Sequence, residues 1–190
     1  HWIVSLYGDK VVPFTAYGVK ADRYTFGHRF LTESSSKKEV STGIKLSLKT
    51  PKDFFSTLEK KGKVICDSQK RQAIISAYLK KAKQTDVDPE LLDEVTYLVE
   101  YPTPLTCSFD KKYLDIPAPV LVECMKKHQK YFPVYSNGPS PKLTQDFIVI
   151  ADSVTAKNKK TIMNGNVRVL TARLEDAQFF WEADKGVALK

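Results

Sequence analysis

Apolar residues in the first part of the chain alternate with polar ones or form short runs, a pattern typical of short β-strands. Two such stretches, residues 2–7 and 11–17, flank the dipeptide Gly8-Asp9. Because glycine and aspartate favour tight turns, the sequence predicts a hairpin here. Further short strands are expected over residues 26–31 and 63–67.

Later stretches place apolar residues three and four positions apart, which is the spacing of one helix face. The segment 50–53 reads Thr-Pro-Lys-Asp, a favourable helix start with threonine at the N-cap and proline in the first turn. In this first helix, Phe54, Phe55 and Leu58 are expected to face inward, and Gly62 to end the element. Further helices are expected over residues 67–82, 88–101 and 119–131, and from 164–166 to beyond Trp181.

Strands are expected over residues 105–109, 134–135 and 147–152, and the turn-rich segment 136–141 joins the last two. Strands gather early and helices intervene later, without the regular alternation of a doubly wound sheet. The sequence therefore predicts an α+β fold, with a mixed or antiparallel sheet and several packed amphipathic helices. Residues 1–190 are interpreted as a single excised region with a possible sub-boundary near residues 101–110.

The composition is compatible with a packed domain, because 42% of the 190 residues are apolar. Mean hydropathy is −0.32, and no apolar run approaches the roughly 20 residues that span a bilayer. No membrane association is therefore expected. The first seven residues lack an initiator Met and the parts of a signal peptide, and they read as a strand from within a longer protein.

The three cysteines, Cys66, Cys107 and Cys124, lie far apart and form no CxxC pair. Such a sparse, odd set of cysteines is typical of reduced thiols, so a cytoplasmic protein is expected, with the thiols buried as small hydrophobic residues. The three histidines show no metal-ligand spacing, so no metal site is expected. The sequence also contains no Walker loop, HExxH, GxSxG or Cys/His nucleophile arrangement, and no catalytic residue is assigned.

The net charge of +8 and the pI near 9.2 suit a polyanionic partner such as RNA. Lys126, Lys127 and Lys130 share one face of the expected helix 119–131. One hypothesis is that these lysines bind phosphates; the other is that they only solvate an amphipathic helix. His128 lies on the opposite, apolar face and is expected to be largely buried.

His28 and Arg29 form a second candidate, which would bind RNA or pair with an acidic residue of a partner subunit. The alternative is a structural junction between a turn and a strand. Arg168, on the last helix, completes the candidate RNA contacts. Arg173 and Asp176 are three residues apart on that helix and are expected to form a surface ion pair.

Several longer segments, in their order and spacing, resemble one known family. They are HWIVSLYGDKVVPF (1–14), GHRFL (27–31), CDSQKRQAII (66–75), LLDEVTYLVEYPTPL (91–105), FDKKYLDIPAPVL (109–121), HQKYFPV (128–134) and GNVRVLTARLEDAQFFWEAD (165–184). Together they resemble the beta subunit of the heterotetrameric bacterial glycyl-tRNA synthetase. The chain departs from the family's usual GNERVL run by having Val167 where an acidic residue is common, which puts a polar role of this position in doubt.

The resemblance implies a division of labour between subunits. In that family the alpha subunit holds the class II aminoacylation site and uses ATP and Mg, whereas the beta subunit mainly engages tRNA. The expected partners are therefore the alpha subunit and tRNA(Gly), and no cofactor is expected in this region. Two alternatives are a structural scaffold without RNA contact and hydrolytic editing of mischarged tRNA; editing is disfavoured because the sequence shows no water-activating metal site or nucleophile.

Overall fold

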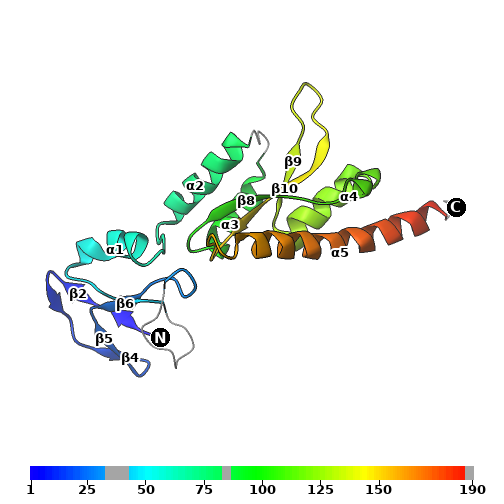
Figure 1. Ribbon diagram of the computed structural model, residues 1–190. Helices are drawn as coiled ribbons and strands as arrows, with labels where there is room; N and C mark the ends of the chain where they lie inside the picture. The colour runs from blue at the N-terminus through cyan, green and yellow to red at the C-terminus, as the bar shows by residue number, and fades with distance from the viewer. Residues whose placement is uncertain (33–42, 83–86, 187–190) are drawn as a thin grey trace. The chain divides into compact units, whose positions relative to one another are not determined.

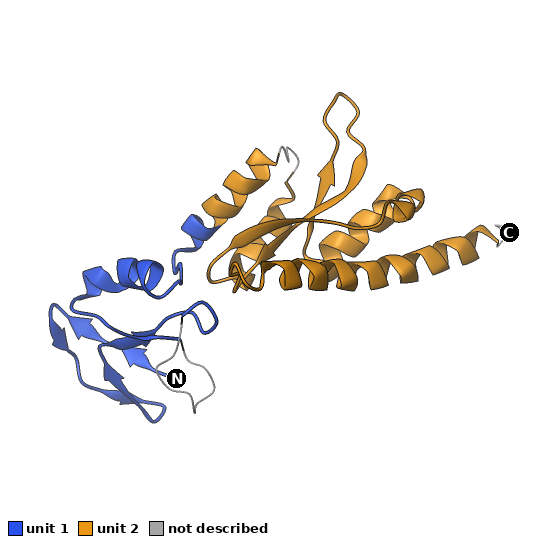
Figure 2. Cartoon of the chain, in the orientation of Figure 1, with its two compact units in different colours: residues 1–71 blue, residues 72–190 orange. Residues whose placement is uncertain are grey.

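The computed structural model describes residues 1–32, 43–82 and 87–186. The chain forms two compact units, residues 1–71 and residues 72–190 (Figure 2). Helices alternate with small sheets of mixed or antiparallel pairing, which confirms the predicted α+β class. The segment 101–110, where the sequence allowed a sub-boundary, contains a strand of the second unit.

The described part of the first unit is built mainly from short strands. The strands are β1 (Ile3–Val4), β2 (Leu6–Tyr7), β3 (Lys10–Val11), β4 (Thr15–Ala16), β5 (Val19–Asp22), β6 (Tyr24–Phe26) and β7 (Lys45–Ser47). The strands β2 and β3 pair antiparallel across Gly8-Asp9, which confirms the predicted hairpin. The strand β5 pairs antiparallel with β4 and parallel with β1.

Residues 12–14 divide the strand expected over residues 11–17 into β3 and β4, and a second hairpin ends it at Tyr17. Tyr17 and Gly18 both have a positive φ, of 52° and 75°, so they form the turn between β4 and β5. Two consecutive residues with positive φ match the twist of paired strands. This turn is hard to predict from sequence, because tyrosine is uncommon in the left-handed region.

The strand expected over residues 26–31 is wrong beyond Phe26, where β6 ends. The backbone at Gly27 lies so close to Gly62 that an added Cβ would stand 2.8 Å from the Gly62 carbonyl oxygen. His28 then closes a turn, because its ring Nδ1 accepts hydrogen bonds from the backbone N–H groups of Phe30 and Leu31, both at 3.2 Å. A side-chain cap of this kind leaves no periodic pattern in the sequence.

The helix predicted after Thr50 is present as the short turn η1 (Pro51–Asp53) followed by α1 (Phe54–Lys60). The backbone N–H of Thr50 donates to the Asp53 carboxylate at 2.9 Å, as in a capping box. Leu58 is buried, but Phe55 is 60% exposed and does not face inward as expected. The strand expected over residues 63–67 is also wrong, because Lys63 has a φ of 52°.

The second unit contains a three-stranded antiparallel sheet with helices on both faces (Figure 1). Its strands are β8 (Thr103–Ser108), β9 (Phe132–Tyr135) and β10 (Leu143–Ala151), in the order β8-β10-β9. Alternate residues of β10 enter two separate clusters: Phe147 packs with one, and Ile148 with the other. The second half of the central strand is therefore buried on both sides, which explains the continuous apolar run of residues 147–151.

One face of this sheet packs against α2 (Ser68–Lys81) and α3 (Pro89–Leu98), through buried residues such as Ile75, Leu79 and Val95. Both helices were predicted. The carboxylate of Asp67 accepts the N–H of Gln69 at 2.9 Å, which caps the start of α2.

The other face packs against η2 (Lys111–Asp115), α4 (Ala118–Glu123), the π-helical turn η3 (Cys124–His128) and α5 (Lys159–Lys185). The helix α5 begins at Lys159 rather than at 164–166, and it continues through Gly165. Asn166 fits inside the helix because its amide nitrogen donates to the Ile162 carbonyl at 2.7 Å, and its oxygen accepts from the Tyr131 hydroxyl at 2.6 Å. Polar residues that read as a turn in the sequence are thus satisfied within a helix.

Candidate nucleic-acid interface

The lysines that the sequence offered as an RNA surface lie on η3 and directly after it. The helix ends at His128, three residues earlier than expected, and its last turn is π-helical. A π-helical turn contains an extra residue and shifts the phase of the residues that follow it. Cys124 and Met125 therefore stay buried, whereas His128 is exposed, and the prediction of a largely buried His128 is wrong.

Each of the three predicted lysines pairs with a carboxylate. The Lys126 ammonium lies 3.1 Å from Asp88, and the Lys130 ammonium lies 2.8 Å from Glu94. Lys127 pairs with Glu123 one turn earlier at 2.5 Å. The structure therefore brings these lysines together on one side of the unit, but with their charges compensated.

Two of these ion pairs connect the η3 region with α3. Asp88 is the N-cap of α3, and its carboxylate accepts N–H groups from Glu90 and Leu91 at 3.1 Å and 3.2 Å. The Leu91 N–H, followed by the Lys126 ammonium, lowers the pKa of the Asp88 carboxyl below its ordinary value. Asp88 thus holds a helix end and a lysine at once, which is a packing role.

His28 and Arg29 have different environments. His28 is 2% exposed, and its ring caps the turn described above, so it has a structural role, in a turn after a strand rather than at a turn-to-strand junction. Arg29 is exposed, and its guanidinium lies 5.6 Å from the centre of the Phe30 ring. Arg29, unlike His28, presents its side chain at the surface.

Arg168 is exposed on α5 and forms no ion pair or hydrogen bond with the described part of the chain. Arg173 and Asp176 lie 3.8 Å apart, which confirms the expected surface ion pair. Two of the six predicted residues lie in the first unit and four in the second. They belong to different elements, and most of them have a partner within the protein.

The buried thiols and phenol are poor candidates for chemistry. Cys107 and Cys124 are buried, and burial raises the pKa of both thiols. Burial also raises the pKa of Tyr131 to about 12. Among the described residues, no group of three or more His, Cys, Asp and Glu side chains could hold a metal ion. No described helix is long and apolar enough to cross a membrane.

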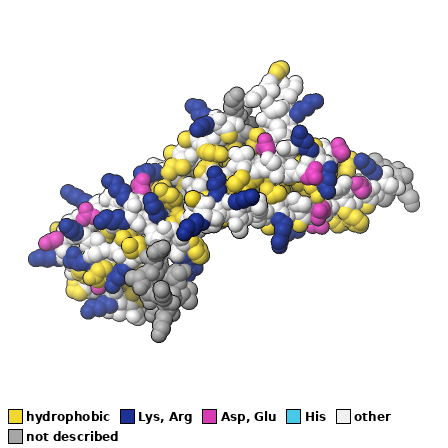
Figure 3. Space-filling view, viewed as in Figure 1, with side chains coloured by type: hydrophobic (Ala, Val, Ile, Leu, Met, Phe, Trp, Pro, Cys, Tyr) yellow, Lys and Arg dark blue, Asp and Glu magenta, His cyan; other side chains and the backbone are white. Residues whose placement is uncertain are grey.

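The uneven distribution of charge between the two units was missed in the sequence. Residues 1–71 contain 14 Lys and Arg against 7 Asp and Glu, whereas residues 72–190 contain 16 against 15. Figure 3 shows Lys and Arg side chains spread over the visible face of the first unit, with few acidic ones among them. Counting charges by region could have found this excess, but the boundary between the units had to be known first.

Comparison with known proteins finds the same family over the whole chain. The family model described as glycyl-tRNA synthetase beta subunit matches residues 1–190. A glycine–tRNA ligase beta subunit of Shewanella halifaxensis is 40% identical over 195 residues, which are 100% of this chain and 26% of that protein. The corresponding protein of Lactococcus lactis is 39% identical over 194 residues, covering 100% of this chain and 27% of its own length. The chain thus spans about a quarter of the relatives that it matches, and it belongs to the glycyl-tRNA synthetase beta subunit family.

Proposed function

We propose that this chain is a tRNA-contacting part of a glycine–tRNA ligase beta subunit and that its basic first unit provides most of the contact. Membership of the family supports a role in charging tRNA with glycine. The observation that carries the RNA contact is the excess of cations in residues 1–71. Each phosphate that a lysine or arginine neutralises releases counterions, so such an excess favours a polyanion.

In this proposal the chain itself performs no catalytic step. Activation of glycine, with ATP and Mg, is assigned to the alpha subunit, as the resemblance implies. The chain would then bind and position tRNA(Gly) and help to assemble the subunits. Lys126, Lys127 and Lys130 become secondary contacts, because phosphates would have to compete with carboxylates for them. Arg168 is the better candidate in the second unit.

A purely structural role is the second candidate, and it is favoured by an apolar groove in the second unit. The groove has a volume of about 540 Å³ and lies between α4–η3 and the last turns of α5. Phe180, in its wall, is 64% exposed. Large exposed apolar side chains around a groove are typical of surfaces that bind another protein segment.

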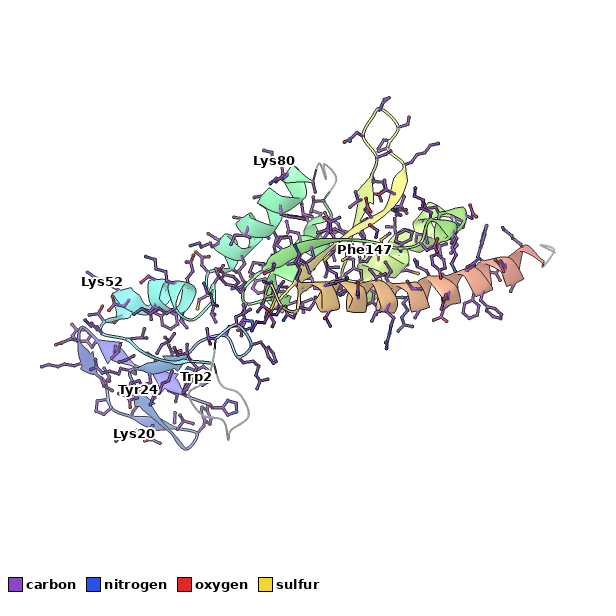
Figure 4. All side chains as sticks on the ribbon, in the orientation of Figure 1. Trp2, Lys20, Tyr24, Lys52, Lys80 and Phe147 are labelled. Carbon is purple, nitrogen blue, oxygen red and sulfur yellow. The ribbon has the colours of Figure 1, made fainter. Side chains whose placement is uncertain are left out.

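The test measures tRNA(Gly) affinity of the full-length beta subunit, purified with its alpha subunit, as a function of salt. One variant changes Lys20, Lys49 and Lys52 of the first unit to Gln; all three are exposed, and Figure 4 labels two of them. The matched control changes three exposed lysines of the second unit to Gln. These are Lys111, Lys142 and Lys160.

The first variant is expected to bind more weakly and to have a salt slope reduced by roughly 0.7 to 0.9 for each phosphate that is no longer neutralised. The control is expected to bind nearly as the wild type. Equal affinity and equal slope for all three proteins would remove the first unit from the RNA surface and favour the structural role.

A further inference from the structure

The first unit exposes aromatic rings beside its cations. Trp2 is 48% exposed, Tyr24 is 36% exposed and Phe30 is 65% exposed. Large aromatic side chains are usually withdrawn from water, because exposing them forgoes the free energy of burial. Rings that remain on a strongly basic surface therefore suggest a ligand with flat faces and negative charge.

Three of the rings and one lysine are linked by contacts around the β6–β7 pair. Trp2 packs edge-on against Phe26, with ring centres 4.8 Å apart. Phe26 is the register partner of Lys45 across β6 and β7. The Lys45 ammonium lies 3.8 Å from the centre of the Tyr24 ring. Tyr24 and Phe26 are two residues apart on β6, so their side chains lie on the same face of the strand. Figure 4 shows Trp2 and Tyr24 in this region.

A second cation–ring pair follows directly in the chain. In the turn after β6, Arg29 lies over the ring of Phe30. The backbone N–H of Phe30 donates to the buried ring of His28, which fixes the Phe30 backbone. The orientation of the Phe30 backbone is thus set by a packed residue rather than left to a free loop. Its own ring remains largely in solvent.

Within the two segments that carry Tyr24, Phe30 and Lys45, the charged residues are all basic. Residues 23–32 and 43–52 contain five Lys and Arg side chains and no Asp or Glu. A protein partner that covered the rings would need acidic residues all around its apolar contact. An RNA strand meets both requirements, because every nucleotide carries a phosphate and a flat base.

We infer that Tyr24 and Phe30, with Lys45 and Arg29 beside them, form a binding site for unpaired RNA nucleotides. Each cation lies over one face of its ring, so a base stacks on the opposite face and the cation faces the phosphates. The bases must be unpaired, because a base within a duplex has both faces covered by its neighbours. This inference rests on the proposed function, since it identifies the part of the RNA that the first unit contacts.

The test again uses the full-length beta subunit with its alpha subunit, and the variants Tyr24→Leu and Phe30→Leu. Leucine keeps an apolar side chain but removes the flat ring. The matched control is Phe179→Leu in α5, because Phe179 is 68% exposed and Phe30 is 65% exposed. We expect each variant of the first unit to bind tRNA(Gly) at least about 5-fold more weakly, with an unchanged salt slope, and Phe30→Trp to bind as the wild type. The control is expected to leave binding unchanged.

The outcomes separate this inference from the proposed function. If the lysine variant of the first unit lowers affinity and slope while Tyr24→Leu and Phe30→Leu bind as the wild type, stacking is refuted and the proposed function stands. If neither set of variants changes binding, both are refuted.

Photocrosslinking provides a readout that a merely structural role would not produce. Transcripts containing 5-bromouridine at unpaired positions should crosslink to the tryptic peptide 24–29 or to the peptide beginning at Phe30. Crosslinks confined to residues 72–190 would overturn the inference.

Discussion

The side chain of Asp88 makes two kinds of contact at once. Its carboxylate caps α3 and also pairs with Lys126. The positive charge of Lys126 is therefore compensated within the protein. The sequence predicted a helix that starts at residue 88, but not the ion pair, because the two partners are 38 residues apart. Spacing within a helix can be read from a sequence, whereas such a distant contact depends on the fold.

Replacing Asp88 with Ala is expected to lower the free energy of unfolding by about 1 to 2 kcal/mol, because both the cap and the ion pair are removed. Asp88→Asn is the control: asparagine still caps, so it should cost less than about 1 kcal/mol, the range of an exposed ion pair. Urea denaturation measures both values. A cost for Asp88→Asn as large as that for Asp88→Ala would contradict the assigned cap.

The pH dependence of this effect follows from the lowered pKa of Asp88. A carboxyl with a lower pKa in the folded state binds protons more readily when unfolded. Its stabilisation is therefore complete above its ordinary pKa and is lost as the pH falls through the folded-state value. The difference between the wild type and Asp88→Ala should be constant near neutral pH and narrow below about pH 4. A difference that instead narrowed between about pH 6 and pH 8, where histidine titrates, would point to another group.

Whole helices were the most predictable elements, and the positions where they change direction or phase were the least. The cap at Thr50 and the helix start predicted at residue 67 agree with the first two helices, because capping depends on residues within a few positions. The π-helical turn after Glu123 and the passage of α5 through Gly165 were not predicted. Both depend on packing against the sheet, which can override a local preference.

Gly165 and Gly27 provide a matched pair of substitutions. Gly165 lies inside α5, and an added Cβ there would meet nothing within 4 Å. Gly165→Ala should therefore raise the free energy of unfolding by about 0.5 to 1 kcal/mol, because alanine restricts the unfolded chain and favours the helix. Gly27→Ala should destabilise, because its Cβ would stand 2.8 Å from the Gly62 oxygen. Thermal unfolding of both variants measures whether the free energy of unfolding rises or falls in each. A loss of stability in Gly165→Ala would mean that the helix is strained there.

At the scale of the whole molecule, the sequence placed the most visible positive charge on one helix, whereas the structure shows where the excess of cations lies along the chain. The sequence showed an excess of cations, and the helix with Lys126, Lys127 and Lys130 was its most visible cluster. In the structure that cluster is paired, while the excess is spread over many separate positions in residues 1–71. A dispersed excess has no motif, so only a division into units reveals it.

This distribution predicts how association with RNA depends on ionic strength. Replacing Lys20, Lys49 and Lys52 with Gln should slow association with tRNA(Gly) more at about 0.05 M than at about 0.5 M salt, because salt screens steering charges within a few ångströms at high concentration. Stopped-flow measurements of the full-length complex would test this. An effect of equal size at both concentrations would indicate that the three lysines act at short range rather than by steering.

Alkylation of buried cysteines can be used to measure how often the core of the second unit opens. Cys107 lies in β8 and Cys124 begins the π-helical turn, so both thiols are enclosed in the same core cluster. An alkylating reagent reacts with the thiolate and needs access to the sulfur. Cys107 cannot react until the packing between the sheet and the helices opens, whereas Cys124 also lines the apolar groove beside α5. The rate at which Cys107 is alkylated under native conditions therefore measures the opening free energy of that core, separately from any loosening of residues 1–71.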